Sequence, residues 1–382
     1  MSTLKTTNIQ HASAASAAIT LASDGSAAAT LSSLNGGPLS GTRNRIINGD
    51  MRIDQRNAGA SVTYPGGGSV GNELYVIDRW MCNSTGSTRF SMQRSTTAPS
   101  GFTNSLLITT TTAGTPGASD FCYFGQNIEG FNVADLDFGL SSAKTVTLSF
   151  WVRSSLIGTF GGSLANSAAN RRYPFSFAIS AANTWEYKTV TIAGDTTGTW
   201  LTDNGRGFTL SLNLGNGSSN KGTAGAWATV GMAPTGTVDL VGTNGATFYI
   251  TGVQLEAGSV ATPFERRSYG QELALCQRYC WVFGNVDNSV FGVGYETPAV
   301  GRVSAATPVT MRSSPTFQSS GAGGFTLVDS GSSGRLGTAI ALAFASPTSV
   351  SVDLSASGTT ANAACIMRTT GPSMSMTFSA EL

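Results

Sequence analysis

Short stretches in which apolar and polar residues alternate recur along most of this chain, separated by loops rich in Gly, Ser and Thr. In the clearest stretch, TVTLSFWVRSS, Trp151 lies on one face and four apolar residues share the other: Val146, Leu148, Phe150 and Val152. A period of two residues is typical of β-strands with one buried face. Many short strands joined by turn-rich loops indicate an antiparallel sandwich or jelly roll.

The strand pattern begins at residue 46 with RIINGDMRIDQR, which contains the turn signal Asn48–Gly49. The further predicted strands are 74–82, 89–94, 105–110, 121–128, 145–153, 173–179, 185–192, 209–214, 226–231 and 247–255. We therefore predict an all-β chain with a jelly-roll sandwich over residues 47–264.

Residues 265–281 contain the strongest helical pattern in the chain. An apolar stripe recurs there at spacings of four, three and four: Tyr269, Leu273, Cys276 and Cys280. This is coiled-coil spacing, so we predict a linking helix whose copies meet on a trimer axis. The alternative is a helix that packs under its own sandwich, because a helix this short is marginal alone.

The two ends of the chain differ from the middle in composition or in the pattern of apolar residues. Residues 1–46 are rich in Ser, Ala and Gly, with apolar residues too sparse for an independent core. We predict an extended N-terminal segment there that docks on another protein or on sister chains. Residues 282–382 return to strands and loops and are predicted to form a C-terminal, β-sandwich-like domain.

Composition excludes several classes of protein. Charged residues make up 11% of the chain and the net charge is +1, with no basic patch of the kind that binds nucleic acid. No apolar run approaches the roughly 20 residues that span a bilayer, so no membrane insertion is predicted. The N-terminus lacks the apolar core of a secretory signal. Five cysteines without CxxC spacing argue against a disulfide framework or zinc site, and favour synthesis in the cytoplasm with reduced thiols.

Residues for enzymatic chemistry are scarce. His11, the only histidine, lies in the low-complexity segment, which excludes a Ser-His-Asp or Cys-His site inside either domain. Two carboxylate pairs remain, Asp135 with Asp137 and Asp195 with Asp203, and turn capping explains them better than catalysis. We predict that the protein is not an enzyme and requires no cofactor.

One weak metal signal lies near the first predicted strand. Asn48 and Asp50 offer oxygen atoms of the kind that a structural calcium ion binds. Hydrogen bonding within the local turn explains the same two residues equally well.

Several segments of the chain resemble a known family. They are RNRIINGDMRIDQR, YVIDRW, KTVTLSFWVRSS, NTWEYKTVTIAGDTTGTW and ATFYITGVQLEAGSVATPFERRSYGQELALCQRYC, which lie within residues 43–281. They strongly resemble receptor-binding and tail-fibre proteins of tailed bacteriophages, especially marine and cyanobacterial phages. The opening LKTTNIQHASAASAAITLASDG is similar to the N-terminal attachment segment of such fibres.

The resemblance implies a jelly roll similar to carbohydrate-binding modules, within a homotrimeric fibre of the virion tail. It also implies that residues 1–46 bind tail or baseplate proteins and that host-surface polysaccharide is the ligand. A capsid decoration or head-fibre protein without a ligand is the alternative, and a polysaccharide depolymerase is a third.

Aromatic side chains can cover the apolar C–H faces of a sugar. Trp185, Trp200 and Trp227 lie at strand ends or near loops, with polar candidates nearby: Asn204, Arg206 and Asn216. For Trp200 the sequence favours neither exposure nor burial, so both alternatives stay open. Trp80 and Trp151 are expected in the core, since each lies inside a strong strand pattern.

Arginine is the second candidate class. Four arginines are spread along residues 282–382: Arg302, Arg312, Arg335 and Arg368. Guanidinium groups form charge-assisted hydrogen bonds with carboxylates, so this C-terminal region is predicted to bind acidic surface polysaccharide.

Overall fold

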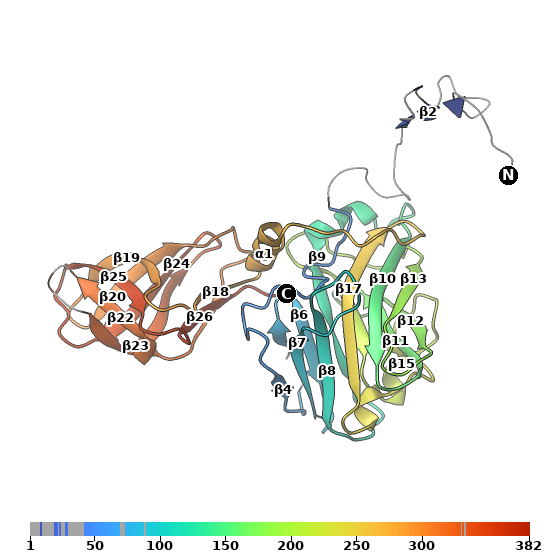
Figure 1. Ribbon diagram of the computed structural model, residues 1–382, viewed down its shortest axis with the longest axis horizontal. Coiled ribbons are helices and arrows are strands. Elements are labelled where there is room, and N and C mark those ends of the chain that lie inside the picture. Colours follow the sequence, from blue (N-terminus) through green and yellow to red (C-terminus); the bar gives the residue numbers. More distant parts are fainter. Residues whose placement is uncertain are drawn as a thin grey trace.

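The computed structural model describes residues 42–68, 73–87, 89–329, 331 and 334–382, together with 8–9, 19–21, 23 and 27–29. This part of the chain forms two β units, with the helix α1 and the C-terminal end of the chain between them (Figure 1). The predicted all-β class is confirmed. Of the first 41 residues, three short strands are described: β1 (Asn8–Ile9), β2 (Ile19–Leu21) and β3 (Ala27–Ala29).

The first unit is a sandwich of two six-stranded antiparallel sheets, as the alternation predicts. The first sheet has the order β13 (Glu186–Ile192), β10 (Val146–Ser154), β17 (Thr247–Ala257), β8 (Ser105–Thr112), β7 (Arg89–Ser95) and β4 (Val62–Tyr64). The second has the order β12 (Arg172–Ile179), β11 (Gly158–Ala165), β14 (Arg206–Asn213), β9 (Cys122–Glu129), β6 (Trp80–Ser84) and β5 (Leu74–Ile77).

The inward faces of these sheets supply the core. Phe124 of β9 and Phe248 of β17 meet edge to face with ring centroids 5.7 Å apart. Trp80 is fully buried, as predicted, and donates its indole N–H to the carbonyl of Asn48 at 3.0 Å. Short connections add η1 (Gly130–Asn132), η2 (Ala134–Leu136), η3 (Ser218–Asn220), η4 (Leu240–Gly242), β15 (Lys221–Gly222) and β16 (Ala233–Pro234).

The C-terminal unit closes into a barrel, whereas sandwich-like packing was the expectation. Its strand order is β19 (Val290–Glu296), β20 (Val300–Ala306), β24 (Ser349–Ala356), β23 (Arg335–Ala345), β22 (Phe325–Asp329) and β25 (Ala364–Thr369). The barrel closes because β25 pairs with both β19 and β22, which removes the exposed sheet edges. Beside it lie η5 (Ala322–Gly324) and a sheet of β18 (Cys280–Gly284), β26 (Ser375–Ser379) and β21 (Thr316–Ser319).

The linking helix is shorter than predicted. The helix α1 covers Tyr269–Gln277, and Ser268 begins it with a capping box, in which its hydroxyl accepts from the backbone N–H of Gln271. Within the described residues no helix combines the length and apolar character needed to cross a bilayer.

The predicted trimer-axis stripe packs against this chain's own sandwich. Cys276 and Cys280 are fully buried. Leu273 is half-buried and packs in one cluster with Cys276 and Ile47. Cys280 already belongs to the strand β18, so it does not continue the helical stripe. Of the four predicted residues, Tyr269 is 58% exposed and Leu273 is partly exposed, whereas the two cysteines are closed to a second chain. The structure therefore corrects this interface and supports the alternative, a helix packed under its own sandwich.

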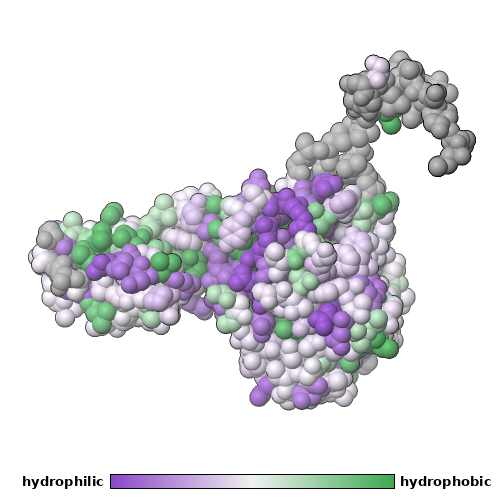
Figure 2. All heavy atoms as spheres, in the orientation of Figure 1, coloured by the Kyte–Doolittle hydropathy of each residue, from purple (hydrophilic) through white to green (hydrophobic). Residues whose placement is uncertain are grey.

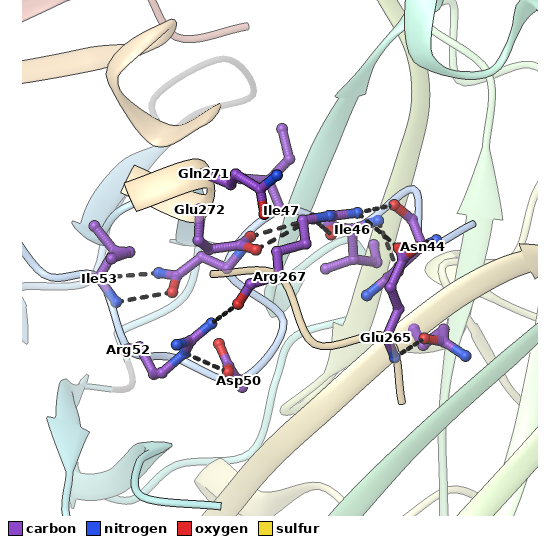
Figure 3. Close-up of polar contacts among 12 residues, drawn as sticks. Asn44, Ile46, Ile47, Asp50, Arg52, Ile53, Glu265, Arg267, Gln271 and Glu272 are labelled. Carbon is purple, nitrogen blue, oxygen red and sulfur yellow. Dashed lines mark hydrogen bonds and ion pairs between the residues drawn. The ribbon is translucent and has the colours of Figure 1, made fainter. Parts of the chain in front are cut away.

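A buried polar junction holds α1 to the first residues of the sandwich (Figure 3). The carboxylate of Glu272 accepts a 2.5 Å hydrogen bond from the backbone N–H of Asn48 and pairs with Arg267 at 3.3 Å. Glu265 accepts from the backbone N–H groups of Arg43 and Asn44 at 3.1 and 2.9 Å. Residues 43–46 are thereby held in the sandwich, although the predicted boundary is residue 46. Figure 2 shows hydrophilic residues gathered over the region between the two units.

A second connection joins the end of the C-terminal unit to the sandwich. Arg79, whose side chain is 1% exposed, forms an ion pair with Glu381, which also pairs with Arg56 at 2.9 Å. The Arg79 guanidinium lies 3.6 Å from the centroid of the Tyr279 ring. The carbonyl of Leu382 accepts a hydrogen bond of 3.0 Å from a side chain of β9. The C-terminal unit is therefore attached to the sandwich at both its beginning and its end.

We expect the substitution Glu381→Ala to lower the free energy of unfolding by about 3–5 kcal/mol, because it leaves the buried Arg79 guanidinium unpaired. The control is Asp135→Ala, whose carboxylate is 49% exposed and pairs with Arg45 at 2.8 Å. Its loss should be about 1 kcal/mol or less. Urea denaturation measures both, and equal losses would contradict the role assigned to Glu381.

Candidate functional site

An aromatic surface lies on the outward face of the first sheet. The alternation along β10 turns Phe150 and Val152 into the core and Trp151 outward between them. Trp151 is paired with Tyr187 of β13 on one side and with Thr251 of β17 on the other. The Trp151 and Tyr187 ring centroids are 5.4 Å apart, and Tyr187 is 45% exposed. The two rings form a surface open to solvent.

These rings border a groove of about 490 Å³. Its lining combines aromatic, small and hydroxyl-bearing residues: Phe102, Ser149, Trp151, Tyr187, Gly252, Ala261, Thr262, Pro263, Phe264 and Arg266. Gly252 has φ 61°, and a Cβ there would lie 2.6 Å from the Phe102 ring. Glycine is required at this position both by the backbone and by the close packing of the ring.

One wall of the groove is the loop 261–266, which two outward-facing side chains of β17 hold in place. Glu256 accepts hydrogen bonds from the backbone N–H and the hydroxyl of Thr262 at 2.8 and 2.6 Å. Gln254 accepts from the backbone N–H of Glu265 at 2.8 Å. Because both side chains are buried, the loop is held against the sheet and the groove is largely pre-formed.

Arginine side chains add positive charge beside these rings. The Arg266 guanidinium lies 4.8 Å from the Phe102 centroid and 5.8 Å from that of Phe264. Further along the same face, Arg153 lies 5.0 Å from the Tyr249 centroid. This arrangement suits a flat ligand with C–H groups on its faces and hydroxyl groups on its edges, because rings cover the former and polar groups bind the latter.

Three tryptophans lie at positions that the sequence had left open or assigned differently. Trp200 is 8% exposed, and its ring meets Phe138 and Phe208 edge to face at 4.9 and 5.1 Å. Trp227 packs on the same cluster, 5.3 Å from Trp200, and donates its indole N–H to a backbone carbonyl at 2.8 Å. Trp200 is therefore a core residue, and Trp227 is partly buried against the same cluster. Trp151, which was expected in the core, lines the groove instead.

The loop that carries Trp200 is built around Asp195. Burial opposes ionisation of this carboxyl, but two hydrogen bonds from Arg171, at 2.6 and 2.8 Å, and two from Thr197 outweigh it and lower its pKa. Asp195 therefore has a structural role, as turn capping predicts. Asp135 pairs with Arg45.

The predicted polar ligands of the C-terminal region are engaged within the chain. Arg302 forms two hydrogen bonds of 2.7 Å with Asp353, and Arg335 pairs with Glu296 and Asp329. The guanidinium of Arg312 donates to three backbone carbonyls, including that of Asn204 at 3.1 Å. Asn204 in turn donates to the carbonyl of Arg312 at 3.4 Å. These contacts hold the fold together, so the arginines are not the free cations that the sequence suggested.

The candidate calcium ligands are likewise used locally. The Asn48 side chain donates to the carbonyls of Ile53 and Asp78 at 2.8 and 3.0 Å and accepts from the N–H of Ile53 at 2.9 Å. Asp50 pairs with Arg52 at 2.5 Å. Within the residues that the structure describes, no group of three or more His, Cys, Asp or Glu side chains is arranged to hold a metal ion.

Comparison with known proteins gives no match to a family model and none to a curated protein. Among solved structures, a Bacteroides thetaiotaomicron protein whose name proposes sugar binding is 13% identical, with a TM-score of 0.32, covering 56% of this chain and 100% of its own. A family 11 carbohydrate-binding module of Clostridium thermocellum is 11% identical, with a TM-score of 0.25. The match covers 52% of this chain and 100% of that module.

A third similar structure is the enzymatically active domain of tailspike protein 4 from bacteriophage CBA120. It is 12% identical, with a TM-score of 0.27, and the match covers 47% of this chain and 19% of that one. At TM-scores of this size, the fold assignment depends on the strand order described above.

We expect Trp200→Ala to destabilise the protein by about 3–5 kcal/mol, since it opens a cavity in a cluster of aromatic rings. Trp151→Ala should cost less than about 2 kcal/mol, because that ring is only partly buried. Chemical denaturation of the two variants measures the difference. The reverse order would place Trp151 in the core and remove it from the groove.

Proposed function

We propose that this protein is a non-enzymatic virion protein of a tailed bacteriophage that binds host-surface glycan through the groove beside Trp151. The observation that carries the proposal is the Trp151–Tyr187 surface, which is open to solvent and faces a loop held in place. A sugar ring stacked there would place its hydroxyl groups near Ser149, Thr262 and Arg266. The phage assignment is supported by the resemblance of the segments within residues 43–281.

The same resemblance supports the remaining parts of the proposal. Residues 1–46 would attach the protein to tail or baseplate proteins, after synthesis in the host cytoplasm. A structural decoration protein without a ligand and a depolymerase are the competing functions. The first predicts no glycan binding, and the second predicts release of reducing sugar.

We propose that the homotrimer contact lies on the barrel, because both cysteines of the helical stripe are buried within this chain. Three large side chains are exposed on the barrel, two on β19 and one on β23: Val293 (70%), Tyr295 (48%) and Phe344 (63%). Val293 and Phe344 end a cross-strand row whose middle members are Ser304 and Ser351. The four side chains of this row are uncharged, and those at its two ends are apolar. Such a row suits burial against sister chains.

Light scattering of the full chain should return three times the mass of a monomer, and Phe344→Asp should lower that mass by placing a charge in the contact. The matched control is Phe131→Asp, which changes an equally exposed ring (61%) on the sandwich. A monomer mass for the unaltered chain would contradict the trimer.

We expect Trp151→Ala to weaken binding to isolated host-surface glycan at least tenfold, because removing a central aromatic contact commonly costs more than 1.4 kcal/mol. Isothermal calorimetry measures the affinity, and Phe131→Ala, which removes an exposed ring outside the groove, is the control. Unchanged affinity in the Trp151 variant would contradict the site. Release of reducing sugar by the unaltered protein would contradict the non-enzymatic assignment.

A further inference from the structure

A second hollow, of about 320 Å³, lies on the outward face of the other sheet. Thr209 and Ser211 of β14 and Ala165 of β11 contribute to its lining, and they alternate with core residues along their strands. Neighbouring strands and loops add the charged and aromatic residues of the lining: Glu73, Phe121, Tyr123, Arg172 and Arg206. This hollow and the Trp151 groove therefore occupy opposite faces of the sandwich.

Arg172 is fixed in the hollow by its backbone. It pairs with Ala165 of β11 on one side, and on the other it exchanges two backbone hydrogen bonds of 2.8 Å with Ala228. Its guanidinium Nε donates to the carbonyl of Ala169 at 3.2 Å. Within the described part of the chain, no carboxylate lies within ion-pair distance of Arg172. Burial accordingly lowers the pKa of this guanidinium, as expected for a desolvated cation without an anionic partner.

A second guanidinium, that of Arg206, lines the same hollow. Its nearest carboxylate is Glu73, at 3.8 Å, which is a long contact for an ion pair. Burial raises the pKa of the Tyr123 hydroxyl above its usual value, while Arg206 and Arg172 both oppose that rise. Both guanidinium groups therefore lie near enough to the Tyr123 hydroxyl to lower its pKa. With two cations and one carboxylate, the hollow has a net charge of +1.

Polar oxygens and an aromatic wall complete the hollow. The Thr209 hydroxyl donates to the side-chain carbonyl of Asn127 at 2.9 Å and keeps its own lone pairs as acceptors. The hydroxyl of Ser211 lies 3.0 Å from that of Ser163. Phe121 and Tyr123 form a tilted aromatic pair with centroids 5.6 Å apart. The site thus offers charge, hydrogen-bond acceptors and an apolar surface within one space.

We propose that this hollow binds a uronic acid unit of an acidic glycan, with Arg172 as the main partner of the carboxylate. A carboxylate monoanion matches the net charge of the hollow, and the sugar ring that carries it can lie against the aromatic wall of Phe121 and Tyr123. The Thr209 hydroxyl would accept a hydrogen bond from a sugar hydroxyl, which a free oxyanion does not offer. The site deepens the proposed function, on which it depends for the class of ligand.

The test uses the full chain, isothermal calorimetry and a pair of matched probes. One probe is an oligosaccharide of glucuronate, and the other is the same oligosaccharide with each carboxylate reduced to an alcohol. Arg172→Gln should weaken binding of the acidic probe about 10- to 100-fold, the loss expected for a hydrogen bond to a charged group. It should leave binding of the reduced probe unchanged. Arg172→Lys should retain part of the affinity, because it keeps the charge and loses the planar fork.

Arg89→Gln is the control, since Arg89 lies on the other sheet, where its guanidinium donates to the carbonyl of Pro65 at 3.0 Å. Full affinity of the Arg172→Gln variant for the acidic probe would overturn the proposal. Sulfate that displaces the acidic probe at equal concentration would overturn the sugar assignment, because it would show a general anion site.

The variant Trp151→Ala separates this proposal from the proposed function. Binding of the acidic probe that survives Trp151→Ala and is lost in Arg172→Gln supports the hollow, even if the Trp151 groove binds nothing. Loss of acidic-probe binding in Trp151→Ala alone would assign that probe to the groove and overturn the hollow.

Discussion

Burial of the Arg79 guanidinium is the constraint on which the arrangement of the two units depends. Removing a charge from water costs several kcal/mol, and the cost is offset only if the partner arrives with good geometry. Glu381 supplies that partner from the far end of the C-terminal unit, while Glu272 and Arg267 tie the beginning of the unit to the first residues of the sandwich. Two separate attachments leave the barrel little freedom to swing about the connection at α1.

The same fixed frame accounts for the position of both candidate sites. In a sandwich, alternate side chains of each strand point inward and pack in the core. The side chains between them point outward and remain available for other contacts. On one sheet this half carries Trp151 and Tyr187, and a loop held by Gln254 and Glu256 turns the flat face into a groove. On the other sheet it carries small side chains and hydroxyls, so the hollow depends on arginines at its rim.

Much of the architecture could be predicted from the sequence, because alternation with a period of two is a local signal. It gave the strands of the sandwich and placed Trp151 opposite the core face of its strand, although that ring was then interpreted as buried. The failures concern contacts between distant residues. Trp200 is covered by Phe138 and Phe208, and Arg302 is paired with a residue 51 positions away. No local pattern reveals such partners, nor that Arg172 has no carboxylate within ion-pair distance among the described residues.

The ion pair between Arg79 and Glu381 also sets an order of events during synthesis, since 302 positions separate its members. At about 5–20 residues per second, a ribosome needs about 15–60 s to make the intervening chain. During that interval Arg79 must stay hydrated or find a temporary anion, because the last sandwich strand, β17, is made well before Glu381. The sandwich can therefore reach its final packing only after the barrel strands have been made, so the unit translated first is among the last to be completed.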